Sequence, residues 1–238
     1  MVIKMEVYNK NRDNNNSIHD EIREQNAKLK DAPLKEKLSY FKEYYLKTTL
    51  AVIAIAIFVG SLAYTMITAP DDTAFAAYFF NDTGDSSSTV LIDEFVAYTG
   101  IDTKEHEAYI DASMNYSADS GNYTDYTGIE KTMAVIATNE LDIIVGDQEA
   151  FDYFTRSECF HDVTTILPEN LLEKFQDKIY YYTFEETGET VPVGIYVTDS
   201  PKLNENYYYV DKEPILGFLI NSDSIENALT FLEFIYME

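Results

Sequence analysis

Tryptophan is absent from this sequence, and cysteine and positive charge are scarce; the last two shortages exclude classes of function. Cys159 is the single cysteine among 238 residues, so neither an intrachain disulfide nor a cysteine-based metal site of ordinary ligand number can form. Lys and Arg number 17 against 42 Asp and Glu, which gives a formal net charge of -25. Because phosphate contacts need clustered Lys and Arg, we expect no nucleic-acid partner.

Catalytic and metal-binding motifs are also missing. His106 and His161 are not spaced to pair with a further ligand or a nucleophile, and the segment after His106 lacks the second histidine of a zinc helix. Asp111–Asn122 places oxygen-bearing side chains at alternate positions, but Tyr116 stands where a calcium loop needs glycine and Asn122 where it needs glutamate. We predict no catalytic residue, no metal ligand and no cofactor, with loose cation binding by this loop as an alternative to a solvated loop.

One long apolar run is present. TTLAVIAIAIFVGSLAYTMITA, residues 48–69, holds 22 residues without a charge, enough for a helix to cross about 30 Å of hydrocarbon. Ten of the 17 Lys and Arg precede Thr48, which places the N-terminus in the cytoplasm and the C-terminal part outside the cell. We predict a single-pass cell-membrane protein that contacts the lipid bilayer through 48–69. A cleaved signal peptide is the alternative, since Ser61-Leu62-Ala63 has suitable small residues, but the preceding segment of about 47 residues is far longer than a usual leader.

The segment before the apolar run divides into two parts. Residues 1–16 are polar without periodicity, and we predict that they are disordered. Residues 17–47 read as a cytoplasmic helical juxtamembrane segment, broken at Pro33. Its second helix repeats apolar residues beside lysines at helical spacing, so it either lies along the inner leaflet or forms a solvated lead-in to the membrane helix. These apolar residues are Leu34, Leu38, Phe41 and Tyr45.

Residues 70–238 form the predicted outer domain, which contains seven Lys or Arg and 34 Asp or Glu. Expected strands at 74–80, 106–112 and 141–145 alternate with expected helices, of which one ends at Gly100 and one opens with a capping box at Thr127. Such alternation with short connections favours parallel strands. A helix near Pro168, strand-like runs at 179–184, 191–197 and 214–220, and a helix opened by Asp223 follow. We predict an α/β fold with a mixed, largely parallel sheet and flanking helices.

Several segments resemble known families. MAVIATNELDIIVGDQEAFDYF (133–154) and CFHDVTTILPENLLEKF (159–175) resemble the first lobe of bacterial extracellular solute-binding proteins of the Venus-flytrap type. ILGFLINSDSIENALTFLEFI (215–235) resembles the late strand and helix that return to that lobe. EIREQNAKLKDAPLKEKLSYFKEYYLKTT (21–49) resembles the opening of uncharacterised single-pass membrane proteins from clostridia. About 169 residues follow the apolar run, fewer than two lobes and a hinge require, so the resemblance implies a single lobe.

The junction Gly146-Asp147 is the predicted ligand site. In open parallel sheets ligands meet the carboxyl ends of the strands, so we expect Asp147 and Gln148 to share a rim with Asn81 and Asp82. The simpler interpretation is that Asp147 only caps the following helix, a contribution of roughly 1 kcal/mol. Two tyrosine triplets, 180–182 and 207–209, are either stacking surfaces or half-buried strand residues.

Two functional hypotheses follow from these patterns. In the first, the chain is a membrane-anchored, non-catalytic extracellular recognition domain that binds a small solute. In the second, it is an assembly or interaction subunit whose outer domain contacts another membrane protein; an uncharacterised hydrolase is a third and less favoured alternative. A concave pocket near Asp147 would favour the first hypothesis, and a flat exposed apolar patch there the second.

Overall fold

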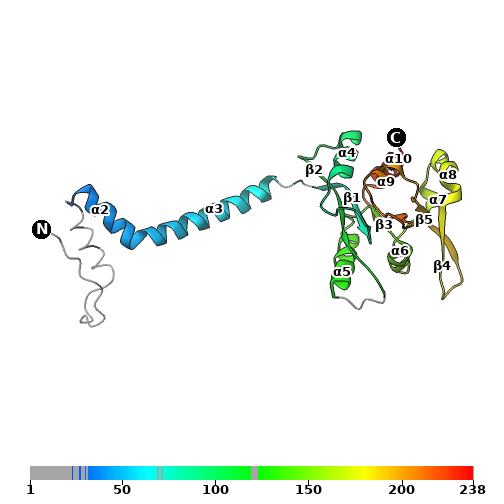
Figure 1. Ribbon diagram of the computed structural model, residues 1–238, viewed down its shortest axis with the longest axis horizontal. Coiled ribbons are helices and arrows are strands. Elements are labelled where there is room, and N and C mark those ends of the chain that lie inside the picture. The colour runs from blue at the N-terminus through cyan, green and yellow to red at the C-terminus, as the bar shows by residue number, and fades with distance from the viewer. Residues whose placement is uncertain are drawn as a thin grey trace. The chain divides into compact units, whose positions relative to one another are not determined.

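The computed structural model describes residues 23, 27, 30, 32–68, 70, 72–118 and 123–237 (Figure 1). The chain divides into two compact units, Met1–Ile67 and Thr68–Glu238, which we describe separately. Residues 1–16, predicted to be disordered, and most of the helix predicted to begin at Ser17 lie outside the described residues.

The described part of the first unit is helical from Leu34 onward. It comprises α2 (Leu34–Tyr40), the π-helical segment η1 (Phe41–Tyr45) and α3 (Leu46–Thr68). The helix α3 has 23 residues, none of them buried against the rest of the protein, and in the described part of the chain it is the one helix long and apolar enough to cross a membrane. It covers residues 48–68 of the predicted span.

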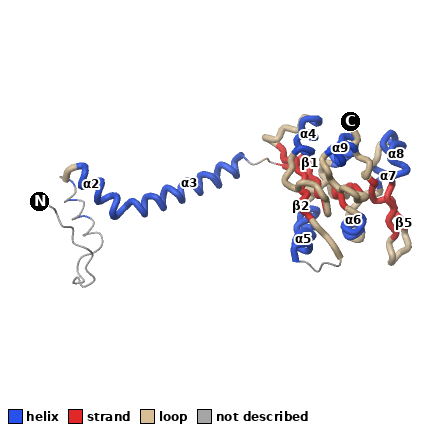
Figure 2. The backbone as a smooth tube through the Cα atoms, in the orientation of Figure 1, coloured by secondary structure: helices blue, strands red, loops and turns tan. Residues whose placement is uncertain are grey.

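The second unit is built on a six-stranded sheet with the order β2-β1-β3-β6-β5-β4. Its strands are drawn in red in Figure 2. The strands are β1 (Asp72–Phe80), β2 (His106–Met114), β3 (Ile143–Gly146), β4 (Ile179–Thr183), β5 (Thr190–Tyr196) and β6 (Ile215–Phe218). The β1 strand pairs in parallel with β2 and β3, whereas the β3–β6, β6–β5 and β5–β4 pairs are antiparallel. The predicted α/β fold with a mixed sheet and flanking helices is therefore confirmed. The predicted largely parallel pairing is wrong, because only the β1–β2 and β1–β3 pairs are parallel and the other three pairs are antiparallel. A hairpin joins β4 to β5 and forces these two strands to run in opposite directions. The alternation of strands and helices that favours parallel pairing therefore does not apply to this half of the sheet.

Helices cover both faces of the sheet. One face packs against α4 (Val90–Thr99), α7 (Val163–Ile166), α8 (Glu169–Phe175), α9 (Pro201–Glu205) and α10 (Ile225–Ile235). The other face packs against α5 (Tyr123–Ala137) and α6 (Gln148–Thr155). Figure 1 shows the two groups on opposite sides of the strands. A short 3-10 turn, η2 (Gln176–Lys178), links α8 to β4.

Helix boundaries agree with the sequence where a special backbone conformation marks them. The helix α4 ends at Gly100, whose φ of 73° is the left-handed conformation expected of a C-terminal glycine. The predicted capping box at Thr127 is wrong, because α5 already begins at Tyr123 and Thr127 lies inside it. Its buried residues Ile129 and Ile136 would face the sheet with either start, so apolar periodicity does not fix the first residue. Ser224, and not Asp223, precedes α10.

The α6 side of the core depends on two glycines. Phe151 of α6 is fully buried, and its ring stacks on Phe160 with 4.5 Å between centroids and 1° between planes. A Cβ at Gly194 of β5 or Gly217 of β6 would lie 2.8 Å from this ring. Because real Cβ atoms do not approach so closely, both positions need glycine, and their absent side chains let α6 lie directly on the sheet.

Candidate functional site

Two of the four predicted site residues meet where β1 and β3 end. Asn81 follows β1 and Asp147 follows β3, and because these strands are parallel neighbours their ends lie together. Asn81 Nδ2 donates a hydrogen bond to Asp147 Oδ1 at 2.9 Å. Asp147 also accepts from the Ala150 amide at 3.3 Å, so its helix-capping role is confirmed.

Two further residues, Lys212 and Tyr116, were not predicted from the sequence and form hydrogen bonds with this pair. Lys212 Nζ donates to the Asn81 carbonyl at 2.7 Å and to Asp147 Oδ2 at 3.1 Å. The Asn81 side chain exchanges two hydrogen bonds of 2.7 Å with the backbone of Tyr116, beyond the end of β2. We call Asn81, Tyr116, Asp147 and Lys212 the strand-end network. Its polar groups bond one another and tie three parallel strands to the segment before β6. No local spacing could reveal Lys212, since it lies 65 residues after Asp147.

The other two predicted residues, Asp82 and Gln148, point to different partners. Asp82 Oδ1 accepts from the Gly84 amide at 2.5 Å, and partial burial raises the pKa of Asp82 against the lowering effects of this bond and of Lys212. Gln148 Nε2 lies 3.4 Å from the Tyr180 hydroxyl on β4. The four residues therefore share one neighbourhood, while only Asn81 and Asp147 are joined by a hydrogen bond.

Several residues beside the strand-end network have a strained, left-handed backbone conformation. Of the six non-glycine residues with positive φ in the described ranges, four lie here: Asn81, Tyr207, Tyr209 and Asp211. A left-handed backbone costs such residues about 1–2 kcal/mol each. Buried contacts hold the loop before Lys212 in place, because the Tyr209 hydroxyl donates to the Val145 carbonyl at 2.9 Å. Tyr208 and Tyr209 are buried in a turn, so neither predicted role of the second tyrosine triplet, strand or stacking surface, fits them.

A cleft of about 830 Å³ lies elsewhere on the domain. One wall is the later part of α6 with the loop that follows it, and the other is the β4–β5 hairpin. Since α6 begins where β3 ends and runs back along the sheet, its last turn lies toward the opposite end of the strands from the strand-end network. The cleft has an apolar floor formed by Phe160, Tyr182, Val191 and Val193. None of the four predicted residues lines it.

The walls of the cleft are strongly acidic. Arg156 is the single cation that lines it, and its Nε donates to the Asp152 carbonyl at 3.1 Å. Six carboxylates face this one charge: Asp152, Glu158, Asp162, Glu185, Glu186 and Glu189. Carboxylates crowded against an apolar floor raise the negative potential of a concave surface and favour a cationic occupant.

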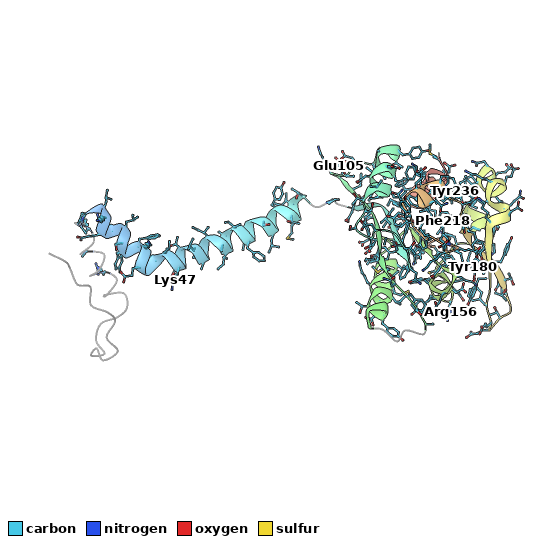
Figure 3. All side chains as sticks on the ribbon, in the orientation of Figure 1. Lys47, Glu105, Arg156, Tyr180, Phe218 and Tyr236 are labelled. Atoms are coloured by element: carbon cyan, nitrogen blue, oxygen red, sulfur yellow. The ribbon has the colours of Figure 1, made fainter. Side chains whose placement is uncertain are left out.

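Asp152, one of the residues that line the cleft, takes part in a partly buried polar contact. The Tyr180 hydroxyl donates to Asp152 Oδ1 at 2.6 Å, and Tyr180 and Arg156 are both labelled in Figure 3. Burial raises the pKa of Asp152, against the bonds from Tyr180 and Gln148 that lower it. Burial also raises the pKa of Tyr180, as does its bond to Asp152. Gln148, Asp152 and Tyr180 thus form a chain of contacts that leads from the strand ends toward the cleft.

Among the described residues, no cluster of three or more His, Cys, Asp or Glu is arranged to hold a metal ion. Asp111 opens the segment for which loose cation binding is the alternative to a solvated loop, and it is engaged by Lys131 at 2.7 Å and by Ser113. Residues 119–122 of this segment lie outside the described residues. Cys159 is buried, and burial raises the pKa of its thiol to about 12.

Comparison of the chain with protein-family models, with curated proteins and with solved structures finds no match.

Proposed function

We propose that the chain is a membrane-anchored, non-catalytic recognition protein that displays its acidic α/β domain outside the cell. The cleft between α6 and the β4–β5 hairpin carries this proposal, because it combines a volume of about 830 Å³ with an apolar floor and acidic walls. Concave sites with these features are typical of ligand-binding surfaces. The cleft, and not the internally bonded strand-end network, is the binding surface in this proposal, and its ligand is cationic.

The membrane anchor rests on α3. No residue of α3 is buried against the rest of the protein, and a helix that is apolar on every side is typical of a bilayer span. Leu34 and Leu38 of α2 are 84% and 71% exposed, which supports contact of α2 with a lipid surface.

We also propose, on the sequence resemblance of 133–154, 159–175 and 215–235 alone, that the acidic domain is a single lobe of the solute-binding type.

The topology can be tested with single introduced cysteines and a membrane-impermeant maleimide. Ser86→Cys, in an exposed turn of the outer domain, should be labelled on intact cells, whereas Ser17→Cys should be labelled only after permeabilisation. Cys159 itself should stay unlabelled in the native protein, because its thiol is buried with its pKa raised to about 12. Labelling of Ser17→Cys on intact cells would refute the proposed orientation.

Ligand binding can be tested by thermal denaturation of the full-length protein in uncharged nanodiscs. At constant ionic strength, spermidine or a lysine-rich peptide should raise the Tm, since a ligand at 100 times its Kd stabilises the native state by about 2.7 kcal/mol. A triple Glu→Gln variant at Glu185, Glu186 and Glu189 should lose this shift. A matched triple Glu→Gln variant at the exposed residues Glu105, Glu107 and Glu130 changes the net charge equally and should retain it. Equal loss in both variants would contradict a site in the cleft.

A further inference from the structure

The outer edge of β4 borders the acidic cleft and has no neighbouring strand in the described part of the chain. The β4 strand is last in the sheet order and pairs only with β5. Its sequence, IYYYT, carries neither charge nor proline. Charged residues and proline are common protections of natural edge strands, and an edge strand without them can serve as a template for further pairing.

The register of the hairpin shows which backbone groups face this open edge. The Phe184 amide donates to the Glu189 carbonyl at 2.9 Å, so Phe184 and Glu189 form a hydrogen-bonded pair. Pairs alternate along an antiparallel ladder, which makes Thr183–Thr190 and Tyr181–Pro192 non-hydrogen-bonded pairs. Pro192 agrees with this assignment, because proline has no N–H to donate. The N–H and C=O groups of Tyr181 and Thr183 therefore point away from β5.

We infer that β4 accepts an extended, basic segment of a partner protein, which adds a seventh strand to the sheet and extends lysine or arginine side chains into the acidic cleft. The inference rests on the proposed recognition function and names the partner class. In an added strand, alternate side chains lie on the face shared by Tyr180 and Tyr182, and Tyr182 lines the cleft. The recognised pattern is thus a cation at every second position.

Charge selects this occupant over a second copy of the chain. A second copy would bring another domain with 34 Asp or Glu and only seven Lys or Arg to an edge that already borders an acidic cleft. Two surfaces of the same charge repel each other, whereas a basic segment complements this edge. On the other face of the sheet, Tyr181 is 55% exposed and offers an aromatic surface to the intervening side chains.

The test uses the full-length protein in phosphatidylcholine nanodiscs, which carry no net charge, and a fluorescent nine-residue peptide that alternates lysine and threonine. Titration followed by fluorescence anisotropy should show binding that weakens with added salt. The same peptide N-methylated at the residues that pair with β4 retains its charge but cannot form the ladder, so its Kd should rise at least about tenfold. A peptide with glutamate in place of lysine should not bind.

A matched pair of protein variants tests the same edge. Thr183→Pro removes one outward N–H at a non-hydrogen-bonded position and should weaken binding about tenfold, whereas Thr183→Val keeps the N–H and should bind like the parent. If Thr183→Pro does not fold, the N-methylated peptide still decides the question.

The outcomes separate this inference from the proposed function. Equal affinity for the plain and N-methylated peptides would refute strand addition and leave a cation-binding cleft. Concentration-dependent dimerisation that Thr183→Pro abolishes would also refute it, with a second copy as the occupant. Failure of the lysine peptide and of spermidine to bind at low salt would refute both the strand addition and the proposed function.

Discussion

Phe231→Ala should destabilise the outer domain by about 3–5 kcal/mol, the range for truncating a fully buried aromatic residue. Phe231 lies on α10 with no exposed surface, and its ring centroid is 4.9 Å from that of Phe75 on β1 and 5.1 Å from that of Phe95 on α4. Removing it leaves a cavity where two helices and a strand meet. Because domains are commonly stable by only about 5–15 kcal/mol, this loss removes a large part of the total.

Urea denaturation of the detergent-solubilised protein would measure this change. The chain has no tryptophan and 20 tyrosines, so tyrosine fluorescence or near-ultraviolet circular dichroism is the suitable signal. Tyr126→Ala is the control, since Tyr126 is a 58% exposed aromatic residue on α5 and its loss should change stability by less than about 0.5 kcal/mol. Similar effects of the two substitutions would contradict the packing described for α10.

Asp142→Ala is the second large effect, with an expected loss of about 3 kcal/mol. Asp142 is buried just before β3, where its Oδ2 accepts from the Ala76 amide at 2.7 Å and its Oδ1 from the Ser222 hydroxyl at 2.5 Å. Alanine would leave the buried amide of Ala76 without a partner, and an unsatisfied buried donor costs about 1–3 kcal/mol in addition to the lost bond to Ser222. The link that the Asp142 side chain makes between Ala76 of β1 and Ser222 would be lost.

Asp142→Asn separates hydrogen bonding from charge. Burial raises the pKa of Asp142 against the bonds from Ser222 and the Ala76 amide that lower it, so the negative charge itself is costly there. Asparagine retains an acceptor oxygen for Ala76 without that charge, and we expect it to cost less than half as much as alanine in the same denaturation experiment. A larger loss for asparagine than for alanine would contradict this account.

Much of the architecture could be read from local patterns. Apolar periodicity located the strands β1 to β6 and the main helices of the outer domain to within a few residues, and Gly100 marked the end of α4. The sequence also brought Asn81 and Asp147 to one edge of the sheet, because residues that follow parallel neighbouring strands must lie close together. These features depend on residues near one another in the chain or on a general rule of sheet construction.

The candidate site was less accessible to sequence reasoning. Lys212 contacts Asp147 from a loop whose conformation depends on buried tyrosines. The sequence around Lys212 contains no pattern that predicts this contact. The cleft joins the end of α6 to a hairpin about 30 residues later, and each part alone reads as a solvated acidic surface. The position of the cleft on the sheet follows from the strand order, and the strand order cannot be predicted from apolar periodicity.

By itself the sequence determined the apolar helix, the charge difference on its two sides and the α/β class, since each depends on composition or on spacing within a single segment. Only the tertiary structure decided that β6 enters between β3 and β5, that Lys212 occupies the predicted site, and that β4 is left with an open edge above an acidic cleft. These outcomes arise from contacts between distant segments, whose free energies depend on packing across the whole domain.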